Sequence, residues 1–287
     1  MATLGINNTI GGTTAAARNI ISGNSPHGIL ISYPEADGNY VQGNYIGTDV
    51  TGKVRDPDGI LDSGDELGNG SDGVSIQVDA DDNTIGSTTA GEGNIISGGD
   101  GVEVRYFIDP DNPSLSDPDP ATGNRILSNS MYQNDTIGID LIHSNNPDGV
   151  TFNDDGDGDG GIPPDPAAAP NRLQNFPVIT SARLTTRLIG GQIRTVTIIR
   201  GTLNSTPSKA TQVFTLQFFG GSTADPSGFG EGKRFLGQMS VTTNGSGNAT
   251  FTFETRKKVR KGQVVTTTAT NQSTRDTSEF SEAQTVT

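Results

Sequence analysis

The sequence predicts an all-β protein in which a short parallel β-helix of about four rungs precedes a β-sandwich. Three observations predict this fold class. Residues 1–150 contain an internal repeat of very short apolar segments, and residues 176–287 alternate apolar and polar positions between turn signals. The composition also disfavours helices, because 39 of the 287 residues are Gly and other poor helix formers such as Asn and Thr are frequent.

The repeat is visible in two short motifs. The Asn-Thr-Ile-Gly of residues 8–11 returns at residues 83–86, and the Asn-Ile-Ile-Ser-Gly of residues 19–23 returns at residues 94–98. A finer unit reads Asn-x-apolar, Asn-x-apolar, Gly-apolar-x-apolar, and it can be laid out in four copies. Alternating apolar positions mark a strand with one buried face, so each copy predicts three short strands. One rung cannot bury its own apolar side, and the rungs are therefore expected to stack around a shared core.

Each strand position predicts one inner ladder of apolar side chains. The expected ladders are Ile10/Val41/Ile85/Ile126, Ile21/Ile46/Ile96/Met131 and Ile29/Val74/Val102/Ile139. Asn and Gly tolerate left-handed backbone angles, so the repeated Asn residues predict turns and stacked amide ladders rather than a ligand site. The insertions at residues 49–72 and 105–123 are expected to form loops outside the coil.

The second half predicts seven short strands, a number typical of an immunoglobulin-like or fibronectin-like sandwich. They are expected at residues 178–184, 195–203, 212–219, 235–242, 249–254, 264–270 and 280–286. The sequence has no Cys and no Trp for the core, which we expect to be filled by Phe214, Leu216, Phe218, Phe251 and Phe253. The predicted organisation is a coil at residues 1–150, an acidic linker at 151–175 and a sandwich at 176–287.

The net charge of -14 conceals two bodies of opposite sign. Residues 1–171 carry 27 acidic and 5 basic side chains, whereas residues 172–287 carry 6 acidic and 14 basic ones. A basic run is expected on a loop between two strands, and it consists of Arg256, Lys257, Lys258, Arg260 and Lys261. Oppositely charged halves of neighbouring molecules would attract one another. The acidic first half disfavours binding of nucleic acid.

Asp alternates with Gly at residues 155–160, as at the start of a calcium-binding loop. Carboxylates at alternate positions can converge on one hard cation, and Gly permits the tight turn. The candidate ligands are Asp154, Asp155, Asp157, Asp159 and Asp165. Pro166 occupies the position of the closing Glu, so a complete EF-hand is excluded. Two alternatives remain, a truncated calcium site that stiffens the linker and a solvated, flexible linker.

Composition excludes several classes of protein. The absence of Cys excludes disulfide scaffolds, thiolate metal sites and a Cys nucleophile. No apolar run approaches the ~18–20 residues that span a bilayer. The first residues show no export signal, yet the composition is that of a bacterial surface protein. We therefore expect an extracellular or cell-surface protein, present as a mature form or as a segment without its export signal.

The motifs also carry a resemblance. Residues 8–13, 18–24 and 41–49 resemble the right-handed parallel β-helix repeat proteins of bacterial surfaces, in the superfamily of the pectate lyases and polygalacturonases. Residues 171–178 resemble the junction that follows the coil in many of those proteins, and residues 201–205 resemble part of the next domain. The resemblance implies a right-handed coil. It implies no particular activity, since the family includes many uncharacterised secreted proteins.

Enzymatic signatures of the family are missing, because neither Gly-His-Gly nor Arg-Ile-Lys occurs. The best catalytic constellation pairs Glu103 with Asp140 on one strand face near His143, although an exposed polar face of the coil is the simpler interpretation. Carbohydrate binding would use exposed aromatic side chains, and the alternation places Tyr40 and Tyr45 outward.

The sequence therefore favours a non-enzymatic structural protein that associates with itself head to tail, as a filament or matrix subunit. An open strand edge templates further pairing unless it is capped, and a head-to-tail contact that does not close propagates. The basic run is expected to contact acidic loops that include Asp62, Asp65 and Glu66. The alternative is a β-helix protein that binds or degrades polysaccharide.

Overall fold

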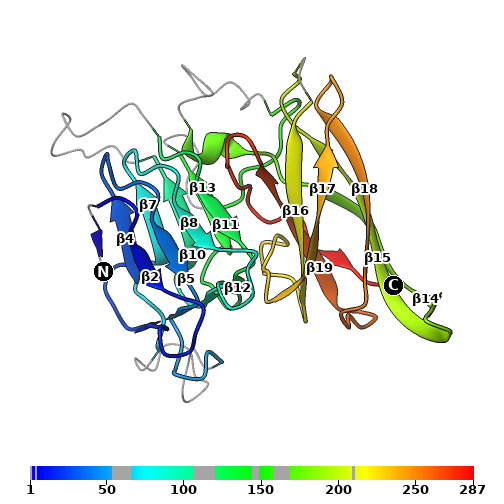
Figure 1. Ribbon diagram of the computed structural model, residues 1–287, viewed down its shortest axis with the longest axis horizontal. Coiled ribbons are helices and arrows are strands. Elements are labelled where there is room, and N and C mark those ends of the chain that lie inside the picture. Colours follow the sequence, from blue (N-terminus) through cyan, green and yellow to red (C-terminus); the bar gives the residue numbers. More distant parts are fainter. Residues whose placement is uncertain are drawn as a thin grey trace.

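The computed structural model describes residues 2–3, 5–53, 66–106, 120–143, 149–157, 169–208 and 211–287. Two β-rich bodies lie side by side, the first formed by the N-terminal half of the chain and the second by the C-terminal half (Figure 1). Within the described ranges the sole helix is the short 3-10 turn Pro170–Leu173. No helix in this part of the chain has the length and apolar character needed to cross a membrane. The predicted all-β class is confirmed.

The N-terminal body consists of three parallel sheets in which every third strand belongs to the same sheet. The strand orders are β1-β4-β7-β10-β13, β2-β5-β8-β11 and β3-β6-β9-β12. One pass through the three sheets makes one rung, and this stacking is compatible with a β-helix. The strands are β1 (Ala2–Thr3), β2 (Thr9–Gly11), β3 (Ile20–Ile21), β4 (Ile29–Ser32), β5 (Tyr40–Gln42), β6 (Tyr45–Ile46), β7 (Asp72–Gln77), β8 (Thr84–Gly86), β9 (Ile95–Ile96), β10 (Asp100–Arg105), β11 (Arg125–Leu127), β12 (Ser130–Met131) and β13 (Ile139–Ile142).

The strand registers pair the residues that the repeat predicts. In the second sheet Ile10 lies opposite Val41, and Ile85 lies opposite both Val41 and Ile126. The predicted ladders of the other two sheets are formed in the same way. All ladder members are buried in one core except Ile21, which is half-buried. The predicted inner ladders are confirmed.

Gly is required at the ends of two second-sheet strands, β2 and β8. Gly11 and Gly86 have φ of +92° and +78°, which L side chains rarely adopt. A Cβ at Gly11 would overlap the carbonyl oxygen of Gln42, and one at Gly86 would overlap that of Leu127. Close approach of the next rung therefore explains why the repeated motif ends in Gly.

Two ladders of Asn side chains follow the corners of the coil. They contain Asn8, Asn39, Asn83 and Asn124 in the first ladder and Asn19, Asn44, Asn94 and Asn129 in the second. At each step the backbone N–H of one Asn donates to the side-chain oxygen of the Asn in the next rung, at 3.0 Å from Asn44 to Asn94. The Asn94 side chain also donates to the carbonyl oxygen of Val41 at 2.8 Å. The predicted stacked amides are confirmed.

The C-terminal body consists of two antiparallel sheets, β14-β15-β18 and β17-β16-β19-β20, and it is compatible with a sandwich. Its strands are β14 (Val178–Ile189), β15 (Gln192–Asn204), β16 (Val213–Gly221), β17 (Arg234–Thr242), β18 (Asn248–Thr255), β19 (Val264–Asn271) and β20 (Gln284–Thr285). Six of the seven expected strands are confirmed with extended or shifted ends. The seventh is shorter than predicted, because residues 276–281 turn toward the coil instead.

The core of the sandwich contains the predicted aromatic residues. Phe214, Leu216 and Phe218 are fully buried, and Phe251 is nearly so. Phe253 is half-buried and stacks on Phe218 with ring centroids 4.1 Å apart. Four of the five predicted core residues are therefore buried, and the fifth covers them.

The sandwich also closes the last rung of the coil. Phe219 and Phe280 pack into the apolar core of the coil rather than into that of the sandwich. Backbone N–H groups of the last rung donate to sandwich side chains, from Gly123 to Asp276 at 2.7 Å and from Leu141 to Glu279 at 3.1 Å. These interactions replace the bonds that a further rung would make.

The same arrangement continues around the rung. Its other N–H groups donate to Thr277 from Ile126, to Gln217 from Ser128, and to Glu231 from Gln133 and Asn134. We call this set of contacts the seam. It consists of the side chains of Gln217, Glu231, Asp276, Thr277 and Glu279 and the backbone N–H groups of the coil that donate hydrogen bonds to them. Asn171, within the expected linker, extends the first Asn ladder by one step, since its side chain accepts the N–H of Asn124 at 2.9 Å.

Candidate functional site

A cluster of three carboxylates lies on the first parallel sheet of the coil. Asp72 begins β7, and Asp100 begins β10 directly opposite it. Glu103 lies three residues further along β10, opposite Ser75. A carboxylate oxygen of each acidic residue lies within 4.8 Å of the others, which defines the cluster Asp72, Asp100 and Glu103. Asp72 is 0% exposed and Glu103 is 1% exposed, whereas Asp100 is half-buried.

Both carboxylate oxygens of Glu103 accept a hydrogen bond. The hydroxyl of Ser75 donates to its Oε1 at 3.1 Å, and Nη2 of Arg105 donates to its Oε2 at 2.8 Å. Asp100 accepts the hydroxyl of Thr136 at 2.5 Å.

Asp72 is engaged on one side only. Its Oδ1 accepts the Ser71 hydroxyl at 3.3 Å. Its Oδ2 lies 2.6 Å from Nδ1 of His27, outside hydrogen-bonding geometry, and both atoms are buried without a hydrogen-bond partner. This oxygen is therefore contacted by the imidazole of His27 but accepts no hydrogen bond of ordinary geometry.

Burial raises the carboxyl pKa values in this cluster. The pKa of Asp72 is raised to about 6 by burial and next by the charge of Asp100. The pKa of Glu103 is raised to about 7 by burial and next by Asp72. Burial lowers the pKa of His27, so its imidazole is neutral at neutral pH. Arg105 is therefore the principal positive charge that faces these three acids.

The predicted pair of Glu103 and Asp140 does share one strand face, because the two residues are in register. The expectation that this face is exposed is wrong. Asp140 is 0% exposed, and His143 is also buried. Glu279 reaches this region from the sandwich, and burial together with the charge of Asp140 raises its pKa well above the usual range. The polar face is thus covered in part by the second body.

Sequence reasoning missed Asp72 and Asp100. Both residues precede the Gly of the Gly-apolar-x-apolar segment, so Asp-Gly stands at the same place in the second and third copies of the repeat. Because equivalent positions of successive rungs lie side by side, this recurrence was the available signal that the two carboxylates meet.

The predicted calcium loop is described only in part. Asp159 and Asp165 lie outside the described residues. Asp157 accepts the backbone N–H of Asn175 at 2.7 Å and the hydroxyl of Ser205 at 3.0 Å, and burial raises its pKa to about 7. Among the described residues, the sheet cluster is the sole group of three acids close enough to share an ion, so Asp154, Asp155 and Asp157 form no such group.

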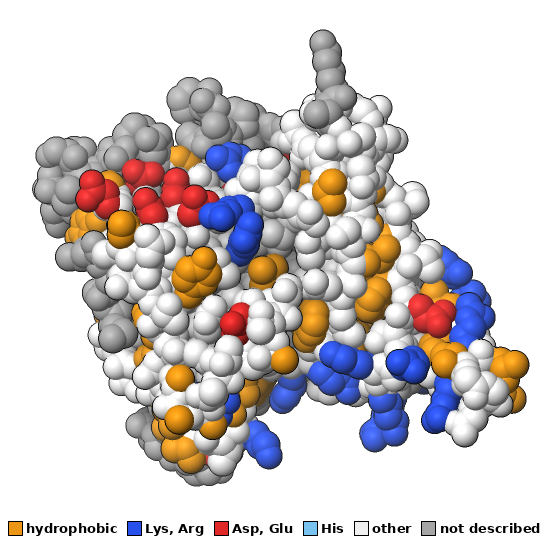
Figure 2. Space-filling view, in the orientation of Figure 1, with side chains coloured by type: hydrophobic (Ala, Val, Ile, Leu, Met, Phe, Trp, Pro, Cys, Tyr) orange, Lys and Arg blue, Asp and Glu red, His pale blue; other side chains and the backbone are white. Residues whose placement is uncertain are grey.

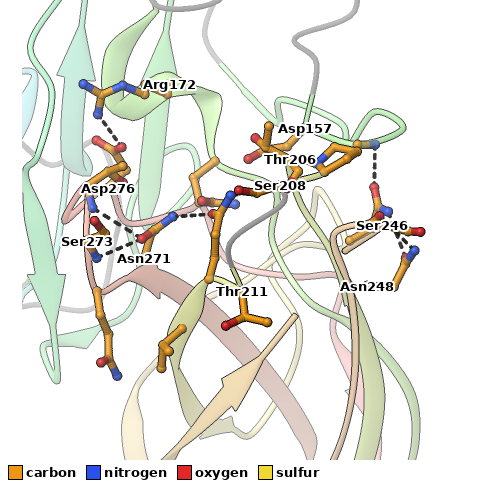
Figure 3. Close-up of a pocket in the computed structure, with 18 of the residues that line it drawn as sticks. Asp157, Arg172, Thr206, Ser208, Thr211, Ser246, Asn248, Asn271, Ser273 and Asp276 are labelled. Atoms are coloured by element: carbon orange, nitrogen blue, oxygen red, sulfur yellow. Dashed lines mark hydrogen bonds and ion pairs between the residues drawn. The ribbon is translucent and has the colours of Figure 1, made fainter. Parts of the chain in front are cut away.

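The linker instead borders a hollow of about 1200 Å³ that is lined by residues of the linker and of the sandwich. Figure 3 shows Asp157 on its wall, together with the ion pair between Arg172 and Asp276 at 2.6 Å. Three of the charged side chains that face this hollow, those of Asp157, Arg172 and Asp276, are therefore already paired or hydrogen-bonded.

The predicted basic run lies on the loop between β18 and β19, as expected. All five basic side chains are exposed, while Val259 between them is buried and anchors the loop. Together with Leu184, Thr195 and Thr197 the loop lines a hollow of about 400 Å³. Lys257 donates to the carbonyl oxygen of Phe235 at 2.9 Å. We call Arg256, Lys257, Lys258, Arg260 and Lys261 the basic loop.

Acidic side chains gather on the coil. Figure 2 shows them at the upper left of the molecule, whereas Lys and Arg gather at the lower right, over the sandwich. Asp62 and Asp65 lie outside the described residues, and Glu66 is half-buried. At one corner of the coil stacked rungs bring acids together, and we call Glu35, Asp37, Asp79, Asp81 and Asp82 the acidic corner.

The tyrosines of the coil differ in exposure. Tyr33 and Tyr40 are 44% and 42% exposed. Tyr45 lies under the guanidinium of Arg18, at 4.0 Å from the ring centroid. Tyr132 is buried and donates its hydroxyl to Gly52 at 2.9 Å. Among these four tyrosines, Tyr33 and Tyr40 are therefore the ones with faces available for stacking on a sugar.

No protein-family model matches this chain, and no curated protein matches it. The class of protein therefore depends on the fold and on the surfaces described above.

Proposed function

We propose that this chain is a non-enzymatic structural protein of the cell surface or extracellular space, which associates with itself head to tail as a filament or matrix subunit. In this proposal residues 1–150 form a right-handed parallel β-helix, residues 151–175 a linker, and residues 176–287 an immunoglobulin-like sandwich. The repeat motifs and the stacked parallel sheets support the coil. The two antiparallel sheets support the sandwich.

The observation that carries the proposal is the separation of charge across two joined bodies. The basic loop is exposed on the sandwich, and the acidic corner lies on the coil. The seam holds the two bodies together through backbone-to-carboxylate hydrogen bonds. A molecule built in this way presents unlike charges in different places, so that copies attract one another in a fixed orientation.

Burial of the carboxylates favours a structural role over hydrolysis. A glycoside hydrolase needs two carboxyl groups that flank an accessible sugar, whereas Glu103 and Asp140 are 1% and 0% exposed. The second candidate function is binding of an acidic polysaccharide. The hollow beside the basic loop and the exposed rings of Tyr33 and Tyr40 favour it.

Sedimentation velocity tests the proposal. At low ionic strength the protein should form large species that dissociate as salt is added, because exposed charges are screened beyond ~8–10 Å near physiological ionic strength. A variant with Arg256→Gln, Lys258→Gln, Arg260→Gln and Lys261→Gln should remain monomeric. Lys257 is kept because it holds the carbonyl of Phe235.

The matched control removes the same number of positive charges from sandwich strands outside the basic loop. It carries Arg183→Gln, Arg187→Gln, Arg194→Gln and Arg200→Gln on β14 and β15, and it should assemble like the wild type. A monomeric wild type at every ionic strength contradicts self-association. In that case, retention of the protein on an acidic polysaccharide that is lost in the basic-loop variant supports the second candidate.

Calcium in the linker belongs to the same proposal. A calcium ion held by Asp154, Asp155, Asp157, Asp159 and Asp165 would stiffen the joint between the two bodies. Asp155→Ala, at an exposed position, should reduce any calcium-dependent rise in thermal stability that arises from this loop. An unchanged rise would remove the loop from the proposal.

A further inference from the structure

We propose that the coil holds a second and separate cation site, in which Asp72, Asp100 and Glu103 bind one divalent metal ion. The three residues come from adjacent rungs, and their carboxylate oxygens lie within 4.8 Å of one another. The strands β7 and β10 fix them in place, because Asp72 pairs directly with Asp100 and Glu103 follows on the same strand. The site is thus built on sheet rather than on a loop.

An unsatisfied buried oxygen points to the ligand. Asp72 is 0% exposed, and its Oδ2 has no hydrogen-bond partner. The atom faces Nδ1 of His27 at 2.6 Å, and that nitrogen also lacks a hydrogen bond. A buried carboxylate oxygen without a donor is costly. A metal ion bound at this oxygen would remove that cost.

The charges of the site favour a cation. Three carboxylates meet there, and Arg105 forms an ion pair with one of them, Glu103. Close carboxylates in a buried place repel one another unless a proton or a metal ion lies among them. An ion can approach from the side of Asp100, which is half-buried, and of His27, whose side chain is 17% exposed.

The donor set indicates the class of metal. Three carboxylate oxygens suit a hard divalent cation such as Ca²⁺, Mg²⁺ or Mn²⁺. A softer ion such as Zn²⁺ would recruit the imidazole of His27 as well. Comparison of Ca²⁺, Mn²⁺ and Zn²⁺ on the wild type and on His27→Gln separates the two cases, because only Zn²⁺ binding should depend on the imidazole.

Thermal unfolding of the full chain tests the site. The protein is stripped with a chelator and studied at high salt, so that self-association does not contribute. Metal at about 100 times its dissociation constant should raise the melting temperature by roughly 5–10 °C. Asp72→Asn should lose that rise. The same variant should also melt higher than the wild type without metal, because it removes one of the repelling charges.

Two further variants keep the test decisive. Asp100→Asn lies at a half-buried position, so it should fold and also lose the metal-dependent rise, which isothermal titration with Ca²⁺ and Mn²⁺ measures directly. Asp155→Ala is the control for the linker loop and should keep the part of the rise that Asp72→Asn and Asp100→Asn lose. A wild type that no divalent cation stabilises, or a rise that is undiminished in both Asp72→Asn and Asp100→Asn, overturns the proposal without affecting that of self-association.

Discussion

The interior of the coil and its seam with the sandwich satisfy the same kind of backbone group in different ways. Between rungs, each corner N–H donates to an Asn side chain that occupies the same place in the next rung, as from Asn44 to Asn94. At the seam, the N–H groups donate to side chains of a different domain, including the carboxylates of Asp276 and Glu279. One solution is periodic, and the other is specific to each position.

This difference has an energetic consequence. An amide oxygen is neutral at every pH, so the Asn ladders keep the same charge in all conditions. A buried carboxylate is a stronger acceptor but is costly to bury in its charged form. The seam should therefore respond more than the ladders to substitution and to pH, while the ladders share their contribution among many similar bonds.

The largest effect is expected from Glu279→Ala. Glu279 is nearly fully buried, and it accepts the backbone N–H of Leu141 at 3.1 Å and that of Thr151 at 2.9 Å. Its removal leaves one buried and one part-buried N–H group without an acceptor, which should lower the free energy of unfolding by about 3–5 kcal/mol. Urea denaturation measures this loss. Glu282→Ala, three residues further on and exposed, is the control and should unfold like the wild type.

A smaller effect is expected inside the coil, from Asn94→Ala. Asn94 is buried, and its side-chain oxygen accepts the N–H of Asn44 at 3.0 Å. One backbone donor is left unpaired instead of two, so the expected loss is about 2–3 kcal/mol. Asn8→Ala, at an exposed position of the other ladder, should cost less than about 1 kcal/mol. Equal losses for Asn94→Ala and Asn8→Ala would falsify the view that the ladder acts by burial.

The contrast also explains what the sequence could predict. Each ladder contact recurs at an equivalent position of the repeat, so the registers of Ile10 with Val41 and of Val102 with Ile139 follow from the pattern alone. The seam has no such pattern, since Gly123 and Asp276 are 153 positions apart and neither is marked by a repeat. For the same reason the sequence predicted a strand at residues 280–286, whereas Phe280 instead fills the end of the coil.

The candidate site could be predicted from the sequence in part, less fully than the ladders but better than the seam. The alternation correctly placed Glu103 and Asp140 on one face, because facing follows from the period of the strand. It could not show that this face is buried, because the period of a strand gives no information about the other body, from which Glu279 reaches the region of Asp140. The sequence could have predicted that Asp72 and Asp100 lie side by side, since Asp-Gly recurs in equivalent rungs. It could not have predicted their burial, because charged side chains on the surface of a coil are usually solvated.

The smallest expected effect, and the sharpest comparison, is the dependence of stability on pH. Burial raises the pKa of Glu231, and burial with the charge of Asp140 raises that of Glu279. The folded protein then binds more protons than the unfolded chain at every pH between the unfolded carboxyl pKa of ~4.3 and the folded values. The contribution of these two carboxyls to stability should therefore be greatest below the unfolded pKa of ~4.3, and it should be lost as the pH rises through their folded pKa values.

Urea denaturation at pH 5 and pH 8 measures this fall, and two variants locate it. Asp140→Asn keeps an oxygen for the N–H of Gly149 but removes the like charge beside Glu279, so its stability should change less with pH than that of the wild type. Asn94→Ala should lower stability by the same amount at both pH values, since the ladder carries no ionisable group. If the wild type instead gains stability from pH 5 to pH 8, the seam carboxyls are charged at little cost. The difference between the seam and the ladders would then be one of geometry alone.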